Sequence, residues 1–179
     1  SPHNVTLTGS LEGLEKIHAH ADGAFFQLLD LDYAFHSRHM DGIHEALCEE
    51  LKDLAPQKSS ARFFSTVTGQ ECKGVNLDAA YWWNNVRQSV QFFPAVHKLC
   101  EEGYRFFVEI GPHAILQRYL RECLQNAGTK GRIFSSLIKT EDGIKRLQTL
   151  SLRLHCLSSA TNREIFFPSR GNPLVSLPL

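Results

Sequence analysis

The residue best suited to chemistry in this sequence is a histidine, His36, which follows an apolar run and has aromatic neighbours. An imidazole has an ordinary pKa near 6.5, so it can take up a proton and return it at neutral pH. Tyr33 and Phe35 precede the histidine closely enough to shape a pocket beside its ring. From these residues alone, a histidine satisfied in a loop after a strand remains the simpler interpretation.

The other histidines and the cysteines do not complete a metal site. His18 and His20 are separated by one alanine, and His39 follows His36 by three positions, but no cluster of cysteines or carboxylates adds further ligands. The five cysteines contain no Cys-x-x-Cys pair and several occupy apolar helix positions. We therefore expect no metal, and we predict reduced cysteines in a cytoplasmic protein.

The overall charge gives no reason to expect a nucleic-acid or membrane partner. Lysine plus arginine and aspartate plus glutamate number 19 each. Between Arg118 and Arg170, however, ten basic residues face only four acidic ones. This excess is typical of a solvated face, and it would also suit an acidic protein partner. No apolar run approaches the roughly 18 residues that a membrane-spanning helix needs.

The elements that must position His36 alternate between apolar strands and amphipathic helices. Alternation of this kind predicts right-handed βαβ units and a parallel sheet. The apolar runs, their spacing and the flanking glycines and prolines predict strands at 5–8, 25–31, 62–68, 106–110 and 133–137, and helices at 10–21, 38–54, 90–102, 114–124 and 142–157. Residues 158–179 lose the periodicity and contain three prolines, which is typical of a linker on the surface.

Six short stretches then carry a more specific signal. The second reads Tyr-Ala-Phe-His-Ser-Arg-His-Met, the fourth contains Tyr-Trp-Trp-Asn-Asn-Val-Arg, and the fifth is Val-Glu-Ile-Gly-Pro-His. In order, the stretches are Val5–Gly9, Tyr33–Met40, Phe64–Gly69, Tyr81–Phe92, Val108–His113 and Phe167–Pro173. Together they resemble the carboxy-terminal part of the malonyl-CoA:acyl-carrier-protein acyltransferase domain of type I polyketide and fatty-acid synthases.

The resemblance implies an α/β fold with a defined domain organisation. Part of an α/β-hydrolase-like large subdomain with a parallel sheet is expected, together with part of a ferredoxin-like small subdomain. The implied boundaries place the small subdomain at 1–32, the acyltransferase core at 33–157 and the linker that follows the acyltransferase at 158–179.

The resemblance also assigns roles to individual residues. His36 becomes the catalytic base and acid, and Asn85, with Asn84 as the alternative, becomes the acceptor that orients its other ring nitrogen, in the family often through a main-chain carbonyl. The simpler interpretation of the two asparagines is that they cap a helix or turn. Tyr33 and Phe35 occupy the positions that sense the substituent on the second carbon of malonate. The sequence Tyr-Ala-Phe-His is a hybrid of the family's malonyl and methylmalonyl patterns, and the bulk of Phe35 favours malonyl.

One departure from the family pattern matters for activity. The family's nucleophile lies in a Gly-His-Ser-x-Gly elbow, and no serine of this sequence has that context. We therefore expect the chain to be inactive alone and to act with the amino-terminal part of its own domain, an adjacent ketosynthase, malonyl-CoA and the phosphopantetheine of an acyl carrier protein, without a bound cofactor. A starter-unit loading acyltransferase and a non-catalytic linker or docking fragment remain alternatives. The long ordered stretch after His36 argues against a serine hydrolase.

Overall fold

The computed structural model describes residues 1–29, 31 and 33–157, and these form two compact units. Among the described residues, the first unit contains residues 1–105 and 118–131, and the second contains residues 106–117 and 132–157. The predicted linker at 158–179 lies outside the described residues. The predicted subdomain boundary between residues 32 and 33 stays a prediction.

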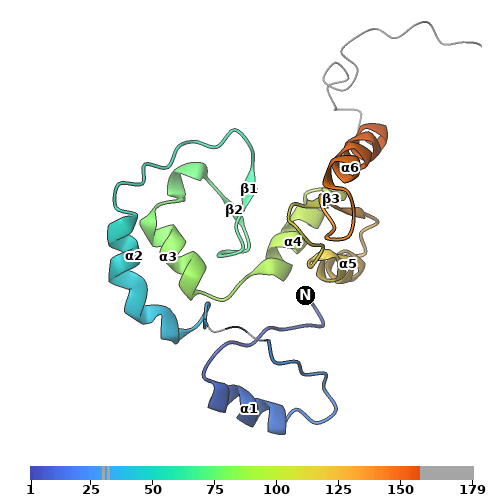
Figure 1. Ribbon diagram of the computed structural model, residues 1–179. Coiled ribbons are helices and arrows are strands. Elements are labelled where there is room, and N and C mark those ends of the chain that lie inside the picture. Colours follow the sequence, from blue (N-terminus) through green and yellow to red (C-terminus); the bar gives the residue numbers. More distant parts are fainter. Residues whose placement is uncertain (30, 32, 158–179) are drawn as a thin grey trace, which may run out of the picture. The chain divides into compact units, whose positions relative to one another are not determined.

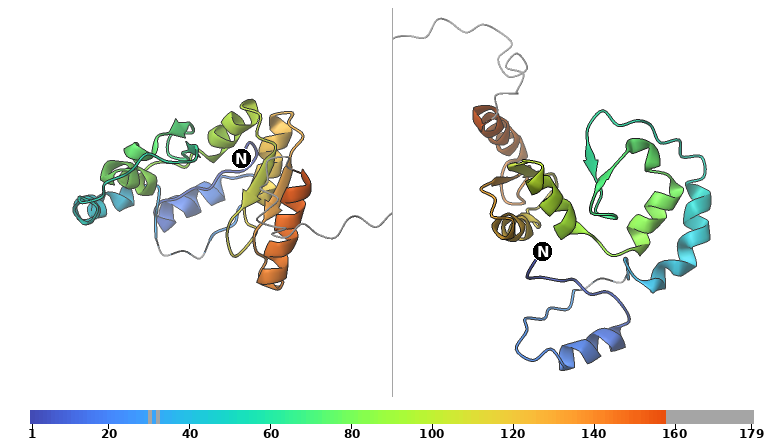
Figure 2. Two further views of the ribbon diagram at one scale, coloured as in Figure 1. Left: turned by 90° about the horizontal axis from the view of Figure 1, so that it is seen from above. Right: turned by 180° about the vertical axis from the view of Figure 1, so that it is seen from behind.

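The second unit is built on a parallel pair of strands. Strand β3 (Phe106–Glu109) pairs with β4 (Arg132–Ser135) in parallel. Helix α6 (Gly143–Leu157) lies beside these strands, and its Arg146 Nη2 donates to Ser135 Oγ over 3.0 Å (Figure 2). Parallel strands need a long connection, and the chain between β3 and β4 contains a helix, as the sequence predicts. The predicted parallel pairing is therefore confirmed.

The first unit is mainly helical. Its elements each match a local sequence signal, such as Ser10, whose Oγ accepts from Gly13 N over 3.2 Å at the start of the first helix. The elements are α1 (Leu11–Ala19), the 3-10 helix η1 (Arg38–Ile43), α2 (His44–Glu50), β1 (Phe63–Phe64), β2 (Glu71–Cys72), the 3-10 helix η2 (Gly74–Asn76), α3 (Ala79–Arg87), α4 (Phe92–Glu101) and α5 (Gln117–Asn126).

The buried apolar side chains of this unit come mostly from α4 and α5. Ala95, Val96 and Cys100 are buried on α4, and Leu120, Cys123 and Leu124 are buried on α5. Val96 and Cys100 are four residues apart, and Leu120 precedes Cys123 and Leu124 by three and four residues, which is the spacing that places side chains on one face of a helix. The predicted helices at 90–102 and 114–124 are therefore confirmed, with ends shifted by a few residues.

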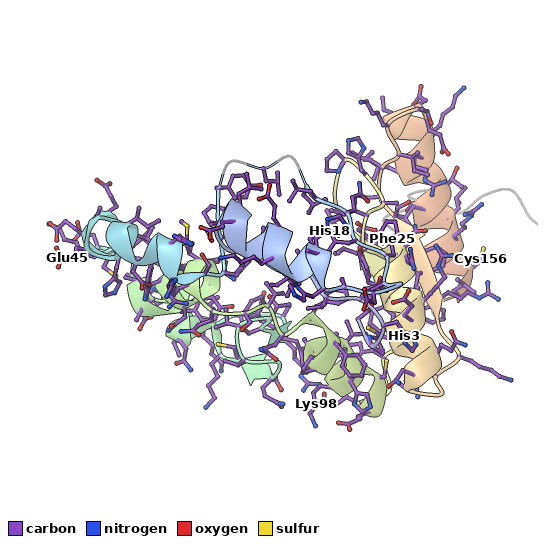
Figure 3. The ribbon with its side chains drawn as sticks, turned by 90° about the horizontal axis from the view of Figure 1, so that it is seen from below. His3, His18, Phe25, Glu45, Lys98 and Cys156 are labelled. Atoms are coloured by element: carbon purple, nitrogen blue, oxygen red, sulfur yellow. The ribbon has the colours of Figure 1, made fainter. Side chains whose placement is uncertain are left out.

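Helices α2 and α3 lie side by side (Figures 1 and 2). The loop that carries His36 precedes η1 and contacts the end of α3. The rings of His44 on α2 and Trp83 on α3 are 4.5 Å apart at their centroids. The predicted helix at 38–54 is confirmed in outline, although its first six residues form η1 and it ends at Glu50. The opposite side of α2 faces solvent, where Figure 3 shows Glu45.

Two predicted strands are wrong over the described residues. Neither 5–8 nor the described part of 25–31 forms a strand, and Val5 and Phe25 are 81% and 88% exposed. An apolar, β-prone run becomes a strand only where a neighbour satisfies its N–H and C=O groups, and neither run has such a neighbour among the described residues.

The predicted strand at 62–68 is much shorter than expected. Ser65 N still donates across the hairpin to Gln70 O over 2.8 Å, but the chain then turns, and Gly69 N donates back to Ser65 O over 2.8 Å, so the strand cannot continue to residue 68. Gly69 has a φ of 72°, a left-handed conformation that glycine adopts without strain. These two bonds close a tight turn that returns the chain from β1 to β2 in antiparallel pairing.

Candidate functional site

The backbone of His36 has an unusual conformation that the end of α3 holds in place. Among the described residues, it is the one non-glycine residue with a positive φ, 65°. For a residue with a side chain this conformation costs roughly 1–2 kcal/mol. His36 N donates to Val86 O over 2.8 Å, so a bond to α3 offsets part of that cost. Strain of this kind gathers at functional sites, where the surroundings enforce it.

The imidazole ring is held by the same end of α3. Its Nδ1 lies 2.8 Å from the main-chain oxygen of Gln88. A carbonyl oxygen can only accept, so Nδ1 must carry the proton in this bond. The neutral ring then leaves the lone pair on Nε2, which is the nitrogen free to act as a base. The geometry therefore fixes one tautomer of His36.

We predicted the acceptor at Asn85, and the contact that the structure shows for Nδ1 is the main-chain oxygen of Gln88. Asn85 lies inside α3 and is partly buried, whereas Gln88 is the residue that ends the helix with an extended backbone, ψ 159°. The last carbonyls of a helix lack partners within it, so the residues at its end present free acceptors. The orienting role of Asn85 stays a prediction, and the carbonyl in contact with the ring lies three residues after it.

The predicted site residues before the histidine do come together in the structure. The rings of Tyr33 and Phe35 are 4.7 Å apart at their centroids, and the rings of Phe35 and His36 are 6.4 Å apart. Tyr33 is 53% exposed and Phe35 is 42% exposed. Two aromatic side chains that border a basic nitrogen and remain open to solvent could form one wall of a substrate site.

Ser37 has a structural role that sequence reasoning missed. Its Oγ donates to Ala34 O over 2.7 Å and accepts from His39 N over 3.2 Å. These bonds close the loop around His36 and cap the start of η1. The sequence signal was present, because a serine directly before a helix is a preferred N-cap residue.

Two buried cysteines among the described residues are poorly suited to this chemistry. The thiols of Cys100 and Cys123 are nearly inaccessible, and burial raises the pKa of each, which disfavours the reactive thiolate. No cluster of three His, Cys, Asp or Glu residues in the described part of the chain could hold a metal ion. Within that same part, none of the helices has the length and apolar character needed to cross a membrane.

His36 thus combines a positive φ with a ring whose Nδ1 faces a main-chain carbonyl. The family is identified by comparison with known proteins. The chain belongs to the acyl transferase domain family, and the match to the sequence pattern of this family covers residues 1–161.

The relatives are synthases of polyketides. Over 179 residues the chain is 33% identical to polyketide synthase GfsE from Streptomyces halstedii. The aligned region covers 99% of this chain but only 5% of that protein. The acyltransferase domain from module 8 of the salinomycin polyketide synthase is 31% identical, with a TM-score of 0.77, over 80% of this chain and 34% of that one. A loading acyltransferase from the avermectin modular polyketide synthase is 29% identical, with a TM-score of 0.72, over 80% of this chain and 45% of that one.

These comparisons confirm the predicted family and the predicted α/β fold class. They also show that the chain spans less than half of each acyltransferase structure and a small part of the synthase that it matches. What the chain contributes to a reaction is therefore argued from its own residues.

Proposed function

We propose that this chain supplies the general base and acid of an acyltransferase that moves malonyl from coenzyme A to an acyl carrier protein in a polyketide synthase. The observation that carries the proposal is the bond from His36 Nδ1 to Gln88 O, which leaves Nε2 as the basic nitrogen. Membership of the acyl transferase domain family and the relatedness to polyketide synthases support it.

In the first half-reaction, His36 Nε2 takes the proton of a serine hydroxyl while the oxygen attacks the thioester carbonyl of malonyl-CoA. The carbon–sulfur bond breaks, and the imidazolium returns its proton to the departing thiolate. The carbonyl of Gln88 stabilises the positive charge that develops on the ring, a role that a carboxylate fills in other triads. The product is a malonyl ester of the serine and free coenzyme A.

The second half-reaction runs the same steps with a different thiol. His36 takes the proton of the phosphopantetheine thiol on the carrier protein, and the sulfur attacks the serine ester. The carbon–oxygen bond breaks, and the imidazolium returns its proton to the serine oxygen. One imidazole therefore serves both directions without a metal or a redox cofactor.

The serine is the part that this sequence does not supply. No serine here lies in a Gly-His-Ser-x-Gly elbow, and Ser37 is engaged with Ala34 O and His39 N. We propose that the nucleophile comes from a part of the synthase outside these 179 residues. On this basis the chain alone forms no acyl adduct with malonyl-CoA, and it works beside that part and a neighbouring ketosynthase in the cytoplasm.

The acyl group is proposed from the pair of rings beside the histidine. Phe35 lies against Tyr33 and next to His36, where it would crowd a methyl group on the second carbon of malonate. The discrimination against one methyl is worth about 1–3 kcal/mol, so selection for malonyl is expected to be incomplete.

A starter-unit loading acyltransferase is the second candidate. The 29% identity to the avermectin loading acyltransferase favours it, and the same histidine chemistry would apply. A competition assay with malonyl-CoA and branched or straight-chain monoacyl-CoA thioesters separates the two. Preferential transfer of a group without a second carboxylate would support a loading enzyme.

The test is mass spectrometry of the acyl adduct on the synthase polypeptide that contains this chain. With malonyl-CoA, the His36→Ala variant should form the adduct about 10²–10⁴ times more slowly than the parent. His39→Ala is the matched control, because His39 is exposed three residues away and only its main-chain N–H is used at the site. Equal rates for the parent and His36→Ala would remove His36 from the mechanism.

A further inference from the structure

The end of α3 contacts His36 through two main-chain carbonyls that lie two residues apart in the chain. Val86 O accepts from the backbone of His36, and Gln88 O accepts from its ring. The residue between these two acceptors is Arg87, the last residue of α3. Any shift of this turn would disturb both bonds to the histidine at once.

Arg87 is itself tied to the segment that carries the histidine. Its Nε lies 2.5 Å from Oδ1 of Asp41, which is in η1, five residues after His36. The Arg87 side chain is 29% exposed and the Asp41 side chain is 59% exposed. The ion pair therefore links the end of α3 to the segment that begins at His36 and continues into η1. The two carbonyl bonds link the same two segments.

The ion pair contributes little to the stability of the whole chain. Exposed pairs are typically worth about 0–1 kcal/mol, and α2 and α3 keep a separate contact through His44 and Trp83. Loss of the pair would therefore leave the helices packed while it frees the last turn of α3. What the ion pair contributes is geometry: it holds Val86 O and Gln88 O in position relative to the strained His36.

We propose that Asp41 and Arg87 are positioning residues that keep His36 in the Nδ1–H tautomer. Their importance for acyl transfer rests on the proposed function of His36, but their effect on the ring does not. A free imidazole side chain prefers to carry its proton on Nε2. The Nδ1–H form therefore persists only while the carbonyl of Gln88 stays within hydrogen-bonding distance.

The experiment measures the tautomer directly. The chain is labelled with ¹⁵N-histidine, and two-bond ¹H–¹⁵N correlations report which ring nitrogen is protonated at a pH where the rings are neutral. The signals of His36 are assigned by their loss in His36→Gln. In the parent chain, His36 should be mainly Nδ1–H. In Asp41→Asn and in Arg87→Gln, the Nε2–H fraction should rise by at least about threefold, by analogy with the loss of other outer-shell partners.

The matched control is Glu71→Gln, which breaks an exposed pair with Arg62 elsewhere in the same unit. It should leave the His36 tautomer unchanged. A His36 ring that stays Nδ1–H to the same extent in Asp41→Asn and Arg87→Gln would overturn the proposal. If neither variant folds, the parent chain is measured in 1 M salt, where a Debye length of about 3 Å weakens the pair. A tautomer ratio that does not respond to salt would also overturn it.

The result separates this inference from the proposed function. In the synthase polypeptide, Asp41→Asn should lower kcat for acyl transfer about tenfold with little change in KM, since positioning affects the chemical step. If the tautomer changes but His36→Ala transfers acyl groups normally, the positioning role stands and the catalytic role of His36 fails. If the tautomer is unaffected, the positioning role fails whatever His36 does.

Discussion

The Nδ1 atom of His36 lies 2.8 Å from the main-chain oxygen of Gln88, a residue 52 positions later in the chain. The partner of the imidazole is thus a backbone group at the end of a helix. A backbone acceptor carries no full charge, and it sets the tautomer of the ring without a carboxylate partner. The orientation of the histidine therefore depends on where α3 ends more than on which side chain stands there.

The first prediction concerns Gln88 itself. Because the acceptor is the carbonyl, Gln88→Ala should keep both the Nδ1–H tautomer of His36 and the rate of acyl transfer within about twofold of the parent. NMR of ¹⁵N-histidine and the mass-spectrometric adduct assay measure the two quantities. A loss of tenfold or more would mean that the side chain of Gln88, and not its carbonyl, serves the reaction.

The second prediction concerns the serine that follows the histidine. Ser37→Ala removes one bond to Ala34 O and one from His39 N, so the free energy of unfolding should fall by about 1 kcal/mol. Urea denaturation of the 179-residue chain measures this change. Ser37→Thr retains the hydroxyl and should recover most of the loss. Ser89→Ala is the control on an exposed serine, and a loss as large as that of Ser37→Ala would contradict the capping role.

Much of the fold could be predicted because its signals are local. Ser10 caps α1 where the sequence places a cap, and the apolar run at 106–110 contains β3. The run at 5–8 and the described part of 25–31 are also apolar or β-prone but form no strand, because strand formation depends on a neighbour that local sequence does not specify.

The sequence could predict the candidate site only where the functional groups belong to side chains. His36, Tyr33 and Phe35 have chemical identities that the sequence displays, and the structure brings them together. We placed the acceptor at Asn85, whereas the ring contacts the main-chain oxygen of Gln88; every residue has a carbonyl, and only the end of α3 decides which one is free. The Asp41–Arg87 pair was missed because the two residues are 46 positions apart and neither stands in a sequence motif of charged residues.

The third prediction concerns the cysteines. Burial raises the pKa of Cys100 and Cys123, so at any pH below those values the thiolate fraction is smaller than for an ordinary thiol, and labelling accelerates as pH rises. Cys156 is exposed on α6 (Figure 3). Iodoacetamide at neutral pH should therefore modify Cys156 at least about tenfold faster than the two buried thiols, as followed by peptide mass spectrometry. In denaturant the three should react alike. Equal rates in the folded chain would contradict the burial of α4 and α5.

The fourth prediction concerns the strain at His36. A φ of 65° suits glycine but not alanine, so His36→Gly should be more stable to urea than His36→Ala by about 1 kcal/mol, although both lack the imidazole. His113 provides the control, because it is exposed and has no positive φ. At this position, His113→Gly should be no more stable to urea than His113→Ala. An equal gain at both positions would show that the preference for glycine is unrelated to the backbone of His36.

The last prediction concerns the choice of acyl group. The ring of Phe35 lies 4.7 Å from that of Tyr33 and borders His36, so Phe35→Ser should open space for one methyl group beside the reacting carbon. In a competition between malonyl-CoA and methylmalonyl-CoA on the synthase polypeptide, the share of methylmalonyl adduct should rise about tenfold, the low end of the 1–3 kcal/mol that one methyl is worth. Tyr33→Phe removes only a hydroxyl and should leave the ratio nearly unchanged. Because both variants keep His36 and Gln88, a fall in total rate without a change in ratio would place Phe35 in support of the histidine and remove it from substrate selection.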